Sequence, residues 1–423
     1  MILKFEHFKR QPVRTVYAPD FLERDGVMTI CAKASTGYYA GTLEYTLQLS
    51  GITPLNNCHS NATSLPEDNP TNASENTGHS LILHIPYKKT GNQTKASALV
   101  RFFDSKQQKI QIDYLFDNST SLDIHTDIPT GCTSITIVLL FICHGNGSAE
   151  FREPTLDISN PKPQRNIHIA TAYIEPKGTA EDNLTQVLAL IEEAGRASDK
   201  PDIICFTECV YDLRCPDRIY IPQNDPVIKT VCEKAKENAI YVLFTAHERD
   251  EQDYYYNTAY LISDKGKICG KYRKTHLTMS EYLAGMVTGN ELPVFDTPWG
   301  KLGVLICWDQ WFYEASRVLA SKGAEIVFWL TRGFHEERLI TRARDNGMYY
   351  VTSHPQPYKC CIAHPTTGEI LVRGNGTTRG YASAKINLNE RPVSEYKSFG
   401  PNGGNDREIF LAERREDLYH YDL

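Results

Sequence analysis

The hydrophobic pattern of this sequence changes at one short polar segment, residues 159–165, which contains Pro161 and Pro163. Before the segment, strand-like runs follow one another at short spacing, with no helical period of comparable strength between them, and this is the signature of a β-sandwich. After it, apolar strands alternate with helical stretches, which is typical of a layered α/β fold. Two prolines among polar residues mark a domain boundary. We therefore predict a β-sandwich at residues 1–160 and an α/β domain at residues 161–423.

The apolar runs give the expected elements of each domain. In the first domain we expect strands at residues 27–32, 41–49, 80–87, 98–103, 109–116, 134–143 and 149–156. Residues 50–79 are dense in Asn, Ser, Thr and Pro, which predicts a long solvated loop. In the second domain we expect strands at 167–173, 202–207, 240–246, 259–263, 267–272, 302–306, 324–330, 349–352, 360–364, 370–373 and 381–387. Helices are expected at 180–197, 226–239, 312–322 and 335–347, the first with Thr179 and Asp182 in a capping-box arrangement.

Composition and charge argue against several classes of partner. The 423 residues carry 45 basic and 52 acidic side chains, for a net charge of −7, which disfavours nucleic acid. No run approaches the ~18 apolar residues of a membrane helix, and no secretory leader is visible at the start, so we expect no membrane partner. The 12 cysteines contain no CxxC pair, which predicts reduced thiols in the cytoplasm unless a leader has been removed. No metal site and no cofactor are expected from these spacings.

Cys307 is the candidate nucleophile. It ends the apolar run at residues 302–306 and is followed by a predicted helix, so its thiol lies at the carboxyl end of a strand, where ligands collect in open α/β folds. Free cysteines are more often small core residues, and a reactive one needs a base and a cation. Glu208 ends another predicted strand, Lys274 follows the predicted hairpin, and Glu281 lies seven residues later. A carboxylate can take the thiol proton, and a lysine can stabilise an oxyanion.

With these residues in this order, the chain resembles the nitrilase superfamily of carbon-nitrogen hydrolases, whose Glu, Lys, Glu and Cys match Glu208, Lys274, Glu281 and Cys307. The similarity covers about residue 166 to the end, and its most specific segments are "KYRKTHL", "TGNELPVFDTPWGKLGVLICWDQW" and "EASRVLASKGAEIVF". The "CWDQW" segment is similar to that of N-carbamoylputrescine amidase-like and aliphatic amidase-like members. The resemblance implies an α-β-β-α sandwich, a thioester intermediate, no cofactor and a homodimer.

Three positions depart from the family pattern. Thr207 stands where a proline usually precedes the first glutamate, Tyr313 where close relatives have proline, and His354 where asparagine is common. Relatives that bind an amino-acid carboxylate have two arginines at the places of Gln310 and Trp311. An N-carbamoyl amino acid is therefore disfavoured, a nitrile is a poorer choice, and an amide or N-carbamoyl amine is expected.

The substrate pocket is expected to use residues around the nucleophile and on the facing loops. The backbone N–H of the residue after the nucleophile would help Lys274 to stabilise the oxyanion, and Arg332 could receive an anion. For His354, lining the pocket and making a structural contact both remain open. The residues predicted to bind substrate are Trp308, Asp309, Trp311, Tyr282, Arg332 and His354.

The first domain is similar in pattern to the jelly-roll modules related to carbohydrate-binding domains. The segments that carry this resemblance are "YTLQLS", "ALVRFFD", "IPTGCTSITIVLLF" and "GSAEFREPTLDI". It implies sugar binding on aromatic platforms, with Tyr38, Tyr39 or Tyr114 as candidates. The alternative is that these aromatics are core or interface residues and that the module only supports the second domain. Two other functions for the whole chain also remain open: a glycan-binding protein with a scaffold α/β half, and an acyltransferase that uses the same cysteine.

Overall fold

The structure of the chain is a computed structural model, which describes residues 1–12, 19–32, 38–49, 79–91, 94–117, 120–161, 163–376 and 378–390. Contacts divide these residues into two compact units, which separate between Pro163 and Gln164. The loop predicted at residues 50–79 lies almost wholly outside the described part of the chain. None of the described helices is both long enough and apolar enough to cross a membrane.

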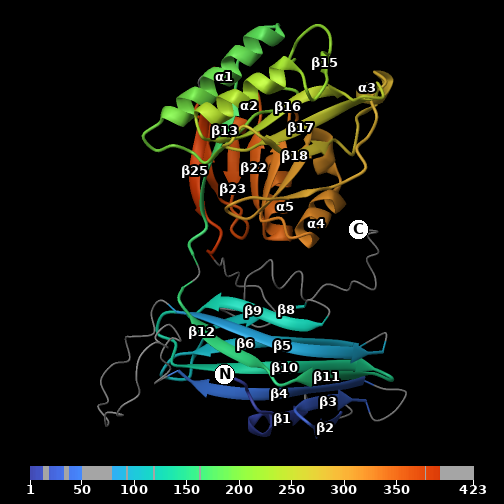
Figure 1. The fold of residues 1–423 in the computed structure, drawn as a ribbon, viewed down its shortest axis with the longest axis vertical. Helices are drawn as coiled ribbons and strands as arrows, with labels where there is room; N and C mark the ends of the chain where they lie inside the picture. Colours follow the sequence, from blue (N-terminus) through green and yellow to red (C-terminus); the bar gives the residue numbers. More distant parts are fainter. Residues whose placement is uncertain are drawn as a thin grey trace. The chain divides into compact units, whose positions relative to one another are not determined.

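The first unit is a sandwich of two antiparallel sheets, preceded by a short 3-10 helix, η1 (Phe5–His7) (Figure 1). One sheet has the order β1-β4-β10-β6-β7, with bounds β1 (Lys9–Pro12), β4 (Tyr38–Gln48), β10 (Ser134–His144), β6 (Thr94–Phe103) and β7 (Lys109–Tyr114). The other has the order β2-β3-β11-β5-β9-β8 with β12 also on β5, and its bounds are β2 (Asp20–Arg24), β3 (Val27–Cys31), β11 (Ser148–Arg152), β5 (Ser80–Thr90), β9 (Ser121–Asp127), β8 (Phe116–Asp117) and β12 (Thr155–Ser159). The β-rich first half is thus as predicted.

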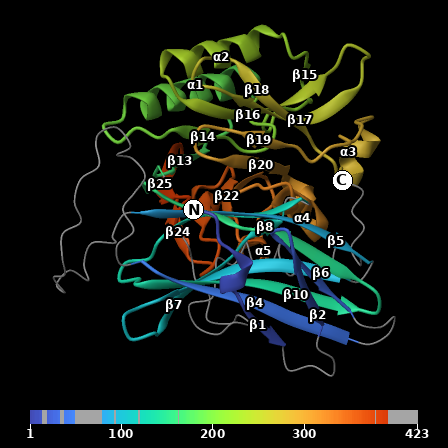
Figure 2. The same ribbon diagram turned by 60° about the horizontal axis from the view of Figure 1, so that its bottom comes forward.

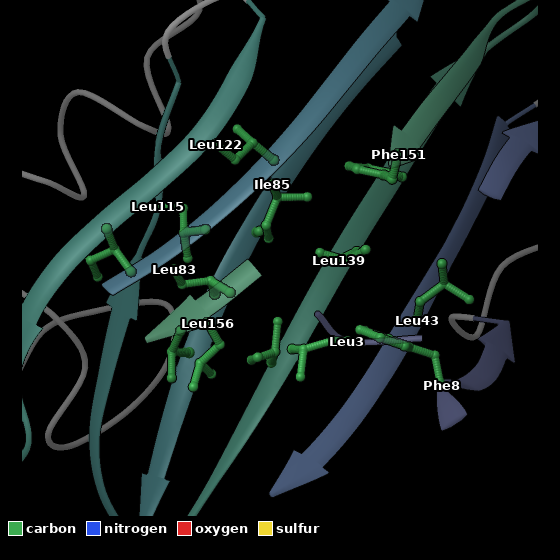
Figure 3. Close-up of a cluster of buried hydrophobic side chains, with 14 of the residues drawn as sticks. Leu3, Phe8, Leu43, Leu83, Ile85, Leu115, Leu122, Leu139, Phe151 and Leu156 are labelled. Atoms are coloured by element: carbon green, nitrogen blue, oxygen red, sulfur yellow. The ribbon is translucent and has the colours of Figure 1, made fainter. Parts of the chain in front are cut away.

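The core of this unit lies between its two sheets. Strand β11 shows why the core forms there. Along this strand, buried Ala149 and Phe151 alternate with exposed Glu150 and Arg152, so the apolar side chains all point to one face. Leucines of both sheets and Phe151 meet in one cluster, which Figure 3 shows. Each sheet therefore contributes one face to this core. The side chains of Tyr38, Tyr39 and Tyr114, the predicted sugar platforms, lie outside the described part of the structure.

The second unit contains two further sheets. The first has the order β18-β17-β16-β14-β13-β25 with β15 beside β16, and its bounds are β13 (Asn166–Tyr173), β14 (Ile203–Cys205), β15 (Tyr220–Ile221), β16 (Tyr241–Arg249), β17 (Tyr255–Ile262), β18 (Ile268–Arg273) and β25 (Gly380–Asn387). The second runs β19 (Val294–Asp296), β20 (Lys301–Ile306), β21 (Ile326–Leu330), β22 (Tyr349–Ser353), β23 (Cys361–Ala363) and β24 (Ile370–Arg373). Strands β13, β14 and β16 are parallel, as are β20, β21 and β22.

Helices cover the outer faces of both sheets. In Figures 1 and 2, α1 (Ala180–Arg196) and α2 (Pro226–Glu237) lie over the first sheet, and α4 (Tyr313–Ser321) and α5 (Glu336–Asn346) lie over the second. Strand β20 shows how the layers form, because Leu305 packs with α4 and α5 whereas Val304 and Ile306 pack against the other sheet. The order is helices, sheet, sheet, helices, which confirms the predicted α-β-β-α sandwich.

Several boundaries differ from the predictions. The run at 149–156 is two strands, β11 and β12, separated at Glu153 and Pro154, since proline cannot donate to the ladder. The predicted helix at 312–322 begins at Tyr313 and is preceded by a 3-10 helix, η3 (Cys307–Trp311). Other elements were not predicted because they are short or polar, namely β1, β2, β8, β9, β15, β19, α3 (Met279–Leu283) and η4 (Pro357–Lys359).

Candidate active site

The four predicted catalytic residues come from loops and strand ends of the second unit. Cys307 directly follows β20, Lys274 directly follows β18, and Glu208 lies three residues after β14. Glu281 lies on the short helix α3. Loops that follow strand ends over a rigid α/β sheet are where functional side chains gather.

A lysine held between two carboxylates forms the centre of the site. The Nζ atom of Lys274 donates to Glu208 Oε1 at 2.9 Å and to Glu281 Oε1 and Oε2 at 3.0 and 2.9 Å. All three residues are at most 2% exposed. Charges buried this far from water need such partners, because leaving one unpaired is very costly. The buried lysine therefore needs the two glutamates as partners, and the glutamates need the lysine.

Asn257, which was not predicted, joins the same two carboxylates. Its Nδ2 donates to Glu208 Oε1 and to Glu281 Oε1, both at 2.9 Å, and the residue is fully buried on β17. The available signal in the sequence was an asparagine within the strand-like run "YYNTAYLI", where a polar side chain requires a partner. Helix α3 contributes in a similar way, because Thr278 donates through its N–H and its hydroxyl to Glu281 Oε2, at 2.7 and 2.8 Å.

These partners set the charges in the cluster. Burial acts to raise the pKa of Glu208, but Lys274 and Arg332 outweigh it and lower this pKa to about 2. For Glu281, burial is likewise outweighed, mainly by Lys274, so its pKa is lowered. Burial acts to lower the pKa of Lys274, but the charges of Glu208, Cys307 and Glu281 raise it well above its usual value. At neutral pH the site therefore contains two carboxylates and an ammonium group.

Cys307 occupies a strained point of the backbone. Its φ of 42° lies in the left-handed region, which costs a non-glycine residue about 1–3 kcal/mol. Its carbonyl accepts a hydrogen bond from Trp329 Nε1 at 3.0 Å. Burial and the charge of Glu208 raise the pKa of the thiol to about 11, although Lys274 acts to lower it. The thiol is therefore protonated at neutral pH and needs a base at the moment of attack.

Asp309 holds the turn that carries Cys307. It is fully buried, and its carboxylate accepts from Ile306 N at 2.8 Å, Tyr272 Oη at 2.6 Å and His276 N at 2.9 Å. Both carboxylate oxygens are engaged by the protein itself. The side chain thus ties η3 to the loop after β18, and contact of Asp309 with a substrate stays a prediction.

The aromatic residues predicted to line the pocket lie nearer the surface. Trp308 is half-buried and its ring centroid is 5.0 Å from that of Trp311, which is 39% exposed. The guanidinium of Arg338 lies 3.7 Å from the centroid of the Trp311 ring. Tyr282, on α3, is 52% exposed. Contact of these three aromatics with a substrate stays a prediction.

Arg332 contacts Glu208, and His354 contacts Arg332. Arg332 Nε donates to Glu208 Oε2 at 3.1 Å, while its side chain remains 45% exposed. Buried His354 bonds through Nε2 to the Arg332 carbonyl at 2.9 Å, and its Nδ1 accepts from Gln356 N at 2.9 Å. Burial and the charge of Lys359 lower the pKa of His354 to about 4. His354 is thus a neutral structural contact that also lines the cavity beside Arg332.

The sequence of the second unit is similar to a described protein family and to several named proteins. Residues 168–391 match the family described as carbon-nitrogen hydrolase. The omega-amidase NIT2 of Mus musculus is 29% identical over 283 residues, which cover 60% of this chain and 96% of that protein. The omega-amidase NIT2-A of Xenopus laevis is 31% identical over 271 residues, covering 56% and 91%. A carbon-nitrogen hydrolase structure from Helicobacter pylori G27 aligns with a TM-score of 0.49 at 21% identity, covering 60% of this chain and 97% of that one.

Proposed function

The chain belongs to the carbon-nitrogen hydrolase family, and from this premise we propose that it hydrolyses the C–N bond of an amide or an N-carbamoyl amine through a thioester on Cys307. The observation that carries the proposal is the buried Lys274 ammonium between two ionised glutamates, in electrostatic contact with the thiol. A cation fixed in a water-poor site stabilises a developing oxyanion far better than water does.

Formation of the thioester needs a base for the Cys307 proton. Glu208 is the base in this proposal, and it acts during attack rather than before it, because the thiol pKa is high and the carboxylate pKa is low. Lys274 couples the two events. As its ammonium turns toward the new oxyanion, its hold on Glu208 weakens and the carboxylate becomes more basic. The backbone N–H of Trp308 is the second proposed oxyanion donor.

The second half of the reaction releases the acyl group. In the proposal, the proton taken by Glu208 passes to the leaving nitrogen, so ammonia or an amine departs as the carbonyl re-forms. Water then attacks the thioester carbonyl with a glutamate as its base, and the Cys307 thiolate leaves. Glu281 keeps Lys274 in place through both steps, and its bonds to Thr278 and Asn257 fix its own position.

Three observations support the proposed class of substrate. Gln310, at one of the places where relatives that bind amino-acid carboxylates have arginine, is fully buried and accepts from Ser316 Oγ at 3.4 Å, so it supports the fold. This disfavours N-carbamoyl amino acids. Arg332 keeps an accessible guanidinium beside Glu208 and is the proposed contact for an anionic group of the substrate. Two relatives are named omega-amidase, which supports an amide as the substrate.

The test is ammonia release from matched panels of amides, N-carbamoyl amines and nitriles. Wild type should turn over one panel and Cys307→Ala should be inactive, while Cys269→Ala, which removes an exposed thiol elsewhere, should retain activity. Mass spectrometry of Glu281→Gln during turnover should show an acyl adduct on Cys307. Turnover by Cys307→Ala, or no adduct in any slowed variant, contradicts the proposal. Transfer of the acyl group to an added primary amine, without release of the free acid into water, would reassign the chain as an acyltransferase.

For the β-sandwich we propose an accessory role, and for the whole chain a homodimer. Binding of the full chain to a glycan array would assign the sandwich a sugar-binding function, and a scaffold role for the second unit requires such binding with no turnover on any panel. Light scattering at several concentrations measures the assembly, and a monomer at all of them removes the dimer.

A further inference from the structure

A large cavity lies beside the proposed catalytic residues. Its volume is about 810 Å³, and it is lined mainly by loops of the second unit that follow β14, β21 and β22. A cavity of this size can enclose a small molecule. Arg332 belongs both to the cavity wall and to the catalytic site, because its Nε donates to Glu208 Oε2 at 3.1 Å. The cavity therefore begins one side chain away from the proposed base.

The wall of this cavity has more basic than acidic side chains. Its basic residues are Arg214, Arg218, Arg332 and Lys359, and its acidic residues are Asp212 and Asp217. This excess of positive charge is local, because the whole chain has a net charge of −7. A concave surface lined by one sign of charge concentrates ligands of the opposite sign. We therefore expect the cavity to attract an anion.

Asp212 does little to balance these cations, because its carboxylate is buried behind the wall. The residue is 6% exposed, and its Oδ2 accepts from Ile219 N at 2.9 Å and lies 2.6 Å from His247 Nδ1. Its Oδ1 is buried as well. Of the two acidic residues in the wall, exposed Asp217 is thus the one that faces the four cations across water.

Three of the four cations have no acidic partner in the described part of the chain. Arg214, Arg218 and Lys359 form no ion pair with a described carboxylate. Arg218 Nη2 donates weakly to the Ser280 carbonyl at 3.5 Å, and Lys359 Nζ lies 5.5 Å from the centroid of the Tyr358 ring. These contacts orient the side chains but leave their charge unbalanced. The cations are therefore available to a ligand.

His354 connects Lys359 with the catalytic end of the cavity. Its Nε2 bonds to the Arg332 carbonyl at 2.9 Å, and burial followed by the charge of Lys359 lowers its pKa. The charges of Lys359 and Arg332 thus act on the same neutral ring, from two neighbouring loops. An anion that contacts Arg332 is consequently within the electrostatic reach of Lys359.

We propose that this cavity binds a doubly charged anionic group at the end of the substrate remote from the reacting carbonyl. A phosphate-type group and a pair of neighbouring carboxylates both have this charge. Of the four positive charges in the wall, Glu208 balances that of Arg332 and Asp217 opposes another, which leaves two. A single carboxylate would leave one cation unbalanced. The proposal rests on the hydrolase function proposed above, with the reacting carbonyl at Cys307 and the chain running past Arg332.

The test is the binding and turnover of matched primary amides. Phosphonopropanamide, succinamate and butanamide have the same chain and end in a doubly charged, a singly charged and a neutral group at mildly alkaline pH. Isothermal titration calorimetry with Cys307→Ala should give the tightest binding for phosphonopropanamide and the weakest for butanamide. Values of kcat/KM for wild type should follow the same order. The terminal monoamide of tricarballylic acid has two carboxylates, and whether it binds more tightly than the phosphonate distinguishes the two forms of the anion.

Failure of this proposal is distinguishable from failure of the hydrolase function. Turnover with equal binding of succinamate and both doubly charged amides overturns the assignment of two charges. Turnover with equal binding of butanamide overturns the anion site itself. Tight binding of phosphonopropanamide with no turnover of any amide by wild type instead contradicts the hydrolase function and supports the anion site.

Matched variants identify the cations that bind the group. Lys359→Gln should weaken binding of phosphonopropanamide relative to butanamide about fivefold, which is about 1 kcal/mol for a screened charge pair. Arg218→Gln should act in the same direction. Lys265→Gln is the control, because it removes an exposed lysine that pairs with Asp264 and does not line the cavity. Circular dichroism checks the fold of each variant. A preference that survives both cavity variants, or that the control also lowers, contradicts the assignment.

Discussion

Replacing Arg332 by glutamine tests how the protein sets the basicity of Glu208. Two cations oppose the effect of burial on this carboxylate and bring its pKa to about 2, namely Lys274 and Arg332. Lys274 is only 1% exposed and cannot be removed without stranding buried charge. Arg332 is 45% exposed and its Nε lies 3.1 Å from Glu208 Oε2, so its charge can be removed at modest cost.

The expected size of the effect follows from this geometry. Two unit charges about 4 Å apart interact by about 4 kcal/mol at an effective dielectric constant of about 20. Water reaches the half-exposed Arg332 and screens it, which reduces the interaction to about 1–1.5 kcal/mol. Since 1.36 kcal/mol corresponds to about one pH unit, Arg332→Gln should raise the pKa of Glu208 by about one unit. In the proposed mechanism Glu208 works as an ionised base, so the acid limb of kcat/KM should move to higher pH by the same amount.

Stability gives an independent readout with the same sign. A carboxylate whose pKa is depressed in the folded state contributes stability above its unfolded pKa and loses it as pH falls through the folded pKa. Arg332→Gln makes the depression of Glu208 smaller, so the variant should lose about 1 kcal/mol at neutral pH and less near pH 2. Urea unfolding at several pH values measures this loss.

The assay is ammonia release in the first seconds after dilution into each buffer, before acid unfolding, with circular dichroism over the same interval. Arg373→Gln is the matched control, because it breaks a surface ion pair with Glu336 and touches none of the catalytic side chains. An acid limb that stays in place in Arg332→Gln, or that also moves in the control, refutes the reasoning.

The remaining predictions probe other supports of the site and the fold. Asn257→Leu removes the amide shared by both site glutamates and should cost about 2 kcal/mol and lower kcat more than it raises KM, as steady-state kinetics would show. Asp309→Ala frees the turn at the nucleophile and should lower both kcat and the unfolding temperature, whereas a change in KM alone would point to substrate contact. Thr179 caps α1, because its Oγ1 accepts from Asp182 N, and Thr179→Ala should lower the free energy of unfolding in urea by about 1 kcal/mol. Phe151→Ala opens the sandwich core and should cost about 3–5 kcal/mol of that unit's unfolding free energy while leaving ammonia release unchanged.

Much of the second unit could be predicted because its strands are buried on both faces. A run such as residues 302–306 is continuously apolar, which marks the strand whatever its neighbours are, and the position of Cys307 at its end follows. Helix α1 was predicted from its cap, and Thr179 Oγ1 does accept from Asp182 N at 3.2 Å. In the first unit, edge strands such as β1 are short and polar, so they have no comparable pattern.

The orientation of single side chains could not be predicted, and this orientation decides which polar side chains contact one another. His247 and Glu248 are neighbours on β16, yet His247 joins Cys209 and Asp212 whereas Glu248 accepts from Arg273 Nη2 at 2.7 Å. Adjacent residues of a strand point to opposite faces, so a register error of one residue exchanges their roles. Asp309 shows the same limit, since a carboxylate two residues after a nucleophile can face a substrate or the turn beneath it.

Cys307 and Cys209 share one backbone feature, a positive φ. Cys307 has a φ of 42° and Cys209 a φ of 51°, and each such non-glycine residue costs about 1–3 kcal/mol. Strain of this kind persists only where surrounding contacts impose it. For Cys307 those contacts are the bonds of Asp309 and Trp329, which fix the thiol without using it. For Cys209 the described contacts are the bond from Val210 N to Thr245 Oγ1 at 2.9 Å and the thiol facing His247 Nε2 at 3.3 Å, and they fix the backbone at the residue that follows Glu208.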